Sequence, residues 1–211
     1  MRVVLFIFIF QLGSIYLIAQ PNNTQPLIDA VTQFHTPVTG NDAKEMVSVF
    51  EKLASTTTGA NAWIPSYYLA ILYSRLSIKN KNIADSYADK AIYWANKSIA
   101  SNPNDENYSA LAMAKISKMA VNPVLRWVTY EKSIYAALNI AKKTNPNNPR
   151  IYILEGSLTL NKPYLFGGGC DKAKPILSKA RVLMEQQIPQ KLLPTWGRQH
   201  LEDLKKSCVF Y

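Results

Sequence analysis

"SNPNDENY" (residues 101–108) and "TNPNNPRIY" (residues 144–152) share an Asn-Pro-Asn core, and the two cores coincide when the chain is shifted by 43 residues. The same shift carries Pro146 to Pro189. A repeat of about this length is typical of arrays of helical hairpins. Proline lacks the N–H that continues a helix and disfavours helical geometry in the residue before it, so each core predicts the end of one helix and the approach to the next.

The segments between the cores have helical periodicity. In residues 84–100, Tyr87, Ala91, Ala95 and Ile99 recur at a spacing that places them on one helical face. Asn122-Pro123 and Asn148-Pro149 each combine a capping side chain with a proline suited to the first helical position, and Asp105 is placed to cap the helix that follows Asn102-Pro103. Strand-like alternation is nowhere sustained. We therefore predict an all-α fold of about seven or eight helices and no sheet.

The N-terminus has the layout of a secretory signal peptide, in which Arg2 precedes an apolar run over residues 3–12. An uncleaved membrane anchor is the alternative, although Gln11 interrupts the run and a span needs about 20 apolar residues. We expect cleavage near Ala19 or Gln20, so that the membrane is met only in transit and the protein is periplasmic or secreted. The predicted organisation is a signal peptide (1–19), a flexible or poorly patterned N-terminus (20–40) and a helical domain (41–211).

The chain is basic, with 24 Lys and Arg against 14 Asp and Glu and a formal net charge of +10. Loss of Arg2 with the signal peptide lowers this charge to +9. The basic residues are scattered, which indicates solvated helix faces, with an acidic partner as the alternative. Export argues against nucleic acid as a partner.

Cys170 and Cys208 are the two cysteines of the chain, and an even pair in an exported protein is more often a disulfide than a catalytic thiol. A helix over about 171–187 followed by an antiparallel helix over about 195–208 would bring the two cysteines together. The alternative is a Cys170 nucleophile with His200 as its base, but a third, orienting group is lacking. "HLED" (200–203) does not place two metal ligands on one helical face. We predict no catalytic residue, no metal and no cofactor.

"PYLFGGGCDKA" (163–173) contains three consecutive glycines. A phosphate-binding loop would follow a strand and end in Lys and Ser or Thr, and this stretch does neither. The glycines are predicted to reverse the chain between two antiparallel helices, with Asp171 capping the second helix.

Two resemblances bear on the fold. The prolines beyond each second helix (Pro103, Pro146, Pro189) and the "RIYILEG" segment resemble tetratricopeptide repeats, whose unit has 34 residues; this chain needs insertions to match that length. Over most of residues 20–211, "AWIPSYYLAILYS" (62–74), "NPRIYILEGSLTLNKPYLFGGGCDKAKPILSKA" (148–180) and "LPTWG" (193–197) resemble exported tetratricopeptide-like proteins of Gram-negative bacteria, a functionally uncharacterised family.

The resemblance implies a short α-solenoid of antiparallel hairpins with a C-terminal capping helix, located in the cell envelope. It also implies an exposed groove with Asn107, Lys118, Arg150 and Asn161 among its residues. The resulting hypothesis is a non-enzymatic scaffold or binding protein that presents this groove to an acidic protein or peptide partner. The alternative is a small-ligand component of a solute-uptake system with a pocket between helices.

Overall fold

The computed structural model describes residues 24–35 and 42–208, and within these ranges the chain forms nine α-helices, three short 3-10 turns and no strand. The all-α prediction is confirmed. The predicted signal peptide lies outside the described residues. The helices are α1 (Gln25–His35), α2 (Asp42–Thr56), α3 (Trp63–Lys79), α4 (Ala84–Ser101), α5 (Asp105–Ala120), α6 (Pro123–Thr144), α7 (Pro149–Asn161), α8 (Cys170–Gln186) and α9 (Arg198–Ser207).

Asparagine side chains cap the starts of α5, α6 and α7. The Asn122 side chain accepts a hydrogen bond from the Leu125 N–H at the start of α6, and Asn148 does the same for the Arg150 N–H at the start of α7. The predicted cap of α5 was wrong by one residue. Asn104 accepts from a backbone N–H in the first turn at 2.9 Å, and Asp105 is already the first residue of the helix.

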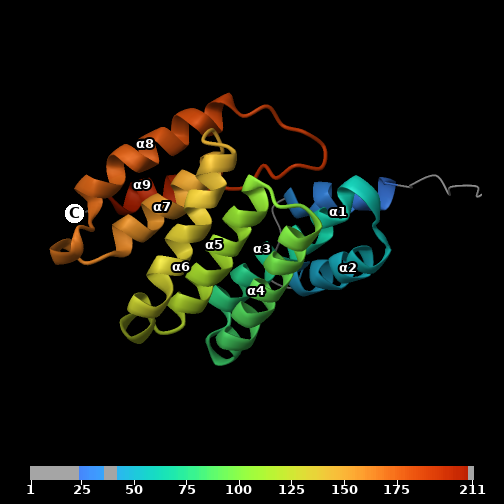
Figure 1. Cartoon of the computed structure of the whole chain (residues 1–211), viewed down its shortest axis with the longest axis horizontal. Coiled ribbons are helices and arrows are strands. Elements are labelled where there is room, and N and C mark those ends of the chain that lie inside the picture. The colour runs from blue at the N-terminus through green and yellow to red at the C-terminus, as the bar shows by residue number, and fades with distance from the viewer. Residues whose placement is uncertain (1–23, 36–41, 209–211) are drawn as a thin grey trace, which may run out of the picture.

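The helices of the array pack in pairs that are adjacent in sequence: α3 with α4, α5 with α6, and α7 with α8 (Figure 1). The first helices of the pairs also contact one another, α3 with α5 and α5 with α7. Buried alanines such as Ala91, Ala95 and Ala141 allow the close approach within and between pairs. Gly156 of α7 serves the same purpose, because a Cβ at this position would lie only 2.9 Å from Cγ of Leu177 in α8.

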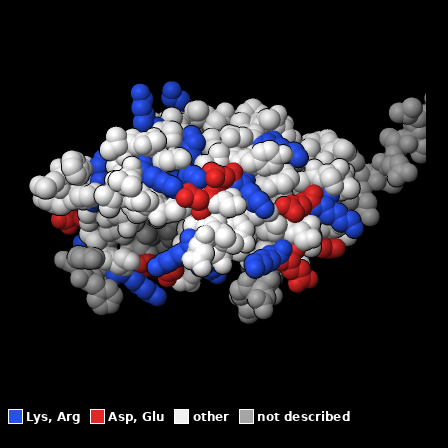
Figure 2. Space-filling model, turned by 90° about the horizontal axis from the view of Figure 1, so that it is seen from below, with Lys and Arg blue, Asp and Glu red and all other residues white. Residues whose placement is uncertain are grey.

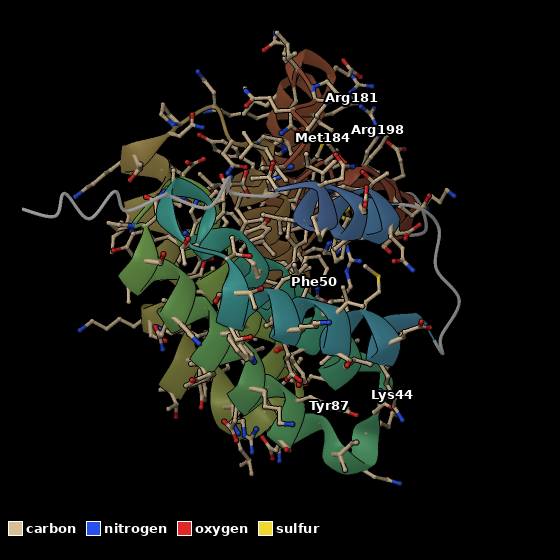
Figure 3. The ribbon with its side chains drawn as sticks, turned by 90° about the vertical axis from the view of Figure 1, so that its right-hand side faces the viewer. Lys44, Phe50, Tyr87, Arg181, Met184 and Arg198 are labelled. Atoms are coloured by element: carbon tan, nitrogen blue, oxygen red, sulfur yellow. A yellow bond between two sulfur atoms is a disulfide. The ribbon has the colours of Figure 1, made fainter. Side chains whose placement is uncertain are left out.

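α3 is the first helix of the array, and α1 and α2 cover this end of it, as the side view in Figure 3 shows. Phe50, labelled in that view, is fully buried; it stacks on Tyr68 of α3 with ring centroids 5.1 Å apart and meets Phe34 of α1 edge-on. Residues 25–35 were expected to be flexible or poorly patterned, and that expectation was wrong. They form a helix because the apolar side chains of Leu27, Val31 and Phe34 share one face and bury it.

α8 and α9 lie at the opposite end, and α9 packs against both α7 and α8. A disulfide joins Cys170 at the start of α8 to Cys208 just after α9, with the two Cα atoms 5.3 Å apart. The predicted pairing is confirmed, and its geometric basis is the antiparallel run of α8 and α9.

The glycine triplet reverses the chain between α7 and α8, as predicted. Gly167 and Gly169 have positive φ angles of 83° and 98°. Gly168 is required for a different reason, because a Cβ there would overlap the backbone carbonyl of Lys162. The expected capping by Asp171 was wrong, since Gly169 occupies the N-cap position of α8 and no side chain caps the helix.

Candidate functional site

A buried ion pair links the first helices of two neighbouring hairpins. Arg150 of α7 is 1% exposed, and its Nε lies 2.9 Å from each carboxylate oxygen of Glu106 in α5. Its Nη2 lies 2.7 Å from Oε1 of the same carboxylate. Burial acts to lower the pKa of Arg150, but the Glu106 carboxylate outweighs it and the pKa is raised. Arg150 therefore stays charged, and its guanidinium and the Glu106 carboxylate neutralise each other inside the protein.

The ion pair continues into a hydrogen-bonded chain that crosses the layer of first helices. Tyr67 of α3 donates to Glu106 at 3.0 Å, and the indole N–H of Trp196 donates to the Tyr67 hydroxyl at 2.7 Å. Burial raises the pKa of Tyr67 well above its usual value, and the Glu106 carboxylate adds to the shift. The hydroxyl is therefore a neutral donor across the working pH range. The network positions α3, α5 and α7 relative to one another.

The segment between α8 and α9 covers part of this layer. Arg150 donates through Nη1 to the Trp196 carbonyl at 3.2 Å, and Tyr68 of α3 donates to the Leu192 carbonyl at 3.5 Å. Trp196 is 7% exposed. In stacked-hairpin arrays the first helices line the groove, so residues 187–197 of this chain occupy a surface that the sequence predicted to be free for a partner.

An open cavity of about 520 Å³ remains beside the covered surface. Its walls come from the start of α5, the loop between α6 and α7, the end of α8 and the segment that follows α8. The lining is mostly amide and carboxylate, with a few apolar side chains; its residues are Trp63, Asn104, Asp105, Glu106, Asn145, Asn147, Asn148, Pro149, Arg150, Leu183, Gln186, Gln187, Ile188, Gln190 and Leu193. This composition suits a polar ligand that forms hydrogen bonds.

The four predicted groove residues do not form one exposed surface. Arg150 borders the cavity but is buried against Glu106, and Asn107 is 0% exposed, with its side chain donating to the Asn102 carbonyl at 2.6 Å. Lys118 lies at the other end of α5, where it pairs with Asp85 at 2.8 Å and Asp89 at 2.7 Å of α4.

Asn161 is exposed, but its side chain bonds to the Ser157 carbonyl of its own helix at 2.8 Å. The expectation of exposure was therefore wrong for Asn107 and Arg150. The physical reason is that α5 and α7 turn these positions toward a neighbouring helix or the segment after α8. Glu106, at the centre of the network, carries no local sequence signal of its role; Trp196 lies in the "LPTWG" segment, whose pattern does not indicate a bond to Tyr67.

A second polar contact joins His35, the last residue of α1, to Tyr68 of α3. Nε2 of His35 lies 3.1 Å from the Tyr68 hydroxyl. Burial lowers the pKa of His35 to about 4, and the positive charges of Arg75 and Arg150 act in the same direction. Burial also raises the pKa of Tyr68, with a further contribution from Glu106. Both groups are therefore neutral near pH 7.

Neither a metal-binding cluster nor a membrane-spanning helix occurs in the described ranges. No cluster of three or more His, Cys, Asp or Glu side chains suited to a metal ion occurs in residues 24–35 and 42–208. None of the helices in those ranges has the length and apolar character needed to cross a bilayer.

Fold and site together define an all-helical protein of paired helices, with a disulfide that links α8 to the end of α9 and an open polar cavity. No protein-family model matches the chain, and no curated protein matches it. Among solved structures, the chain is similar to the HusA haemophore from Porphyromonas gingivalis. The two share 26% sequence identity and a TM-score of 0.77 over 88% of this chain and 92% of the haemophore chain. The similarity thus extends over nearly the whole of both proteins and favours a binding role.

Proposed function

We propose that the protein is a non-enzymatic, exported binding protein built as a short tetratricopeptide-like solenoid that α9 caps. Three sequence-adjacent helix pairs with their first helices in contact support the solenoid. The Cys170–Cys208 disulfide supports export, because disulfides persist in oxidising compartments such as the periplasm and the extracellular space. The predicted cleavage near Ala19 or Gln20 belongs to the same proposal.

The cargo we propose is haem or a closely related tetrapyrrole. The observation that carries this proposal is the similarity to a haemophore over most of both chains. It develops the small-ligand alternative raised by the sequence and makes its ligand class specific. A tetrapyrrole is flat, apolar on its faces and anionic at its carboxylate edge, so a basic protein with exposed apolar side chains offers suitable chemistry.

Titration of the purified protein with haem tests the proposal. The expected result is a saturable change in the Soret absorbance with a dissociation constant in the micromolar range or below. The same protein unfolded in urea serves as the control, because haem associates loosely with any exposed apolar chain. A response that does not saturate, or that is equal for the folded and unfolded protein, would contradict a carrier function.

A second candidate is the protein or peptide partner predicted from the sequence. The observation that favours it is the open cavity lined by amide side chains such as Asn147, Gln186 and Gln190. An acidic partner is less well supported than a neutral one, because Arg150 and Lys118 already pair with carboxylates of the protein itself. Affinity capture from envelope extracts with Gln186→Ala/Gln190→Ala as the control variant tests this candidate; capture unchanged by the substitutions would refute use of the cavity.

A further inference from the structure

Six large apolar side chains are exposed at two neighbouring turns of the array, and together they form what we call the hairpin-end cluster. Val124, Leu125 and Val128 lie in the first two turns of α6, and Tyr164, Leu165 and Phe166 form the 3-10 turn between α7 and α8; each is between 71% and 92% exposed. Single exposed apolar residues are ordinary on a protein surface. A group of six is not ordinary, and such groups mark binding sites.

The two halves of the cluster are adjacent. Val124, Val128 and Glu131 are spaced so that they share one face of α6. Oε1 of Glu131 lies 2.7 Å from Nζ of Lys162, which is two residues before Tyr164. The ion pair therefore joins the apolar face of α6 to the turn that carries the other half. In Figure 1 the start of α6 and the turn before α8 both lie at the left end of the molecule.

The fold itself does not need these side chains. The Arg126 guanidinium points to the other side of α6, where it donates to the Asp85 carboxylate at 2.9 Å through Nη2 and fastens the start of α6 to α4. Val124 and Val128 face away from that contact. Because neither the helix packing nor a cap uses them, their apolar character is unexplained by stability.

Cations border the cluster. Lys132 is exposed and lies on the same face of α6, two turns after Leu125 and one turn after Val128. Lys172 is exposed in the first turn of α8, just beyond the glycine triplet. Figure 2, which views the molecule from below, shows a largely uncharged surface at the left end with basic groups close to it. An apolar platform with cations at its edge complements a flat apolar ligand that carries carboxylates.

We propose that the hairpin-end cluster is the tetrapyrrole-binding site of this protein, an inference that rests on the proposed haem-carrier function. The macrocycle packs its faces against the apolar side chains of α6 and of the turn before α8. Its carboxylates are directed toward Lys132 and Lys172. The polar cavity beside Arg150 is a poorer match, because the apolar faces of the macrocycle would cover many of its amide and carboxylate groups and leave them without hydrogen-bond partners.

A haem titration of three variants tests the site. Val128→Ser/Phe166→Ser removes one apolar side chain from each half of the cluster and is expected to weaken binding at least about tenfold, because both side chains lose contact with an apolar ligand. Lys132→Glu is expected to weaken binding several-fold, with a larger effect at low salt. Ile188→Ser is the matched control, since Ile188 is 83% exposed but lines the polar cavity; it is expected to change affinity less than twofold.

All four residues are exposed or on the surface, so the urea-unfolding midpoint of each variant should match that of the unchanged protein. If Val128→Ser/Phe166→Ser binds haem with the same affinity as the unchanged protein, the hairpin-end cluster is not the binding site, although the carrier function stands. Loss of affinity in Ile188→Ser alone would overturn the proposed site in favour of the cavity. Failure of the unchanged protein to bind haem would refute both proposals. If the double variant loses binding to anionic lipid vesicles while haem affinity is unaffected, the cluster is a membrane contact and the proposal is wrong.

Discussion

Replacing Arg150 by methionine removes the centre of the buried network and should lower stability severely. Its side chain is 2% exposed and that of Glu106 is 10% exposed, so the variant leaves a carboxylate with little access to water. Removing one partner of a buried pair costs about 3–5 kcal/mol. Asn148 and Tyr67 still donate to Glu106, which places the expected loss near the lower end, about 3 kcal/mol. For a chain of this length the melting temperature should fall by roughly 6–12 °C.

Urea unfolding followed by far-UV circular dichroism at pH 7 measures the loss. Lys142→Met is the matched control, because the Lys142–Glu155 pair also joins two array helices, at 2.9 Å, but has side chains 33% and 22% exposed. It should cost less than about 1 kcal/mol. Arg150→Met/Glu106→Gln should recover at least half of the single-variant loss, since no buried charge remains. An Arg150→Met loss equal to that of Lys142→Met, or a double variant whose loss is the sum of the single ones, would refute this account of the network.

Three further measurements probe the ends of the array. Reducing the Cys170–Cys208 disulfide, which spans a sequence separation of 38, should destabilise the fold by about 4 kcal/mol. Dithiothreitol should therefore lower the melting temperature of the unchanged protein. It should not change the melting temperature of the control variant, Cys170→Ser/Cys208→Ser. Because burial lowers the pKa of His35 from 6.5 to about 4, stability is fully present above pH 6.5 and should fall as the pH drops toward 4. His35 is partly exposed, so screening limits the loss to about 1 kcal/mol, and His35→Gln should flatten the pH profile; an identical profile would argue against this role. Gly168→Ala should lower the melting temperature by several degrees because its Cβ overlaps backbone, whereas Gly167→Asn, with open space around it, should be nearly neutral; equal effects would contradict the geometry of the turn.

The helices of the array could be predicted because their boundaries are determined by residues close to each boundary. Asn122-Pro123 and Asn148-Pro149 fix the starts of α6 and α7 through a capping side chain and a proline, both within a few residues of the boundary. α1 could also have been predicted, since Leu27, Val31 and Phe34 have the spacing of an amphipathic helix. The short length of the pattern and the prolines around it obscured that signal.

The surroundings of Arg150 could not be predicted from local pattern. Its carboxylate partner is 44 residues away, and the carbonyl of Trp196 that it contacts is 46 residues away. A groove position and a buried network position have the same helical spacing, so periodicity alone cannot separate them. The expectation of exposure assumed that the first helices of the pairs stay uncovered. In the structure, residues 187–197, which follow α8, cover part of them.

That return of the chain changes how the molecule should fold. In most repeat proteins each unit touches only its neighbours, and unravelling can begin at one end and proceed stepwise. Here the indole of Trp196 bonds to Tyr67 across a sequence separation of 129, so a segment that follows the third helix pair completes the packing of the first pair, α3 and α4. Such distant closure favours slow, all-or-none folding once the entire polypeptide is available, rather than assembly unit by unit.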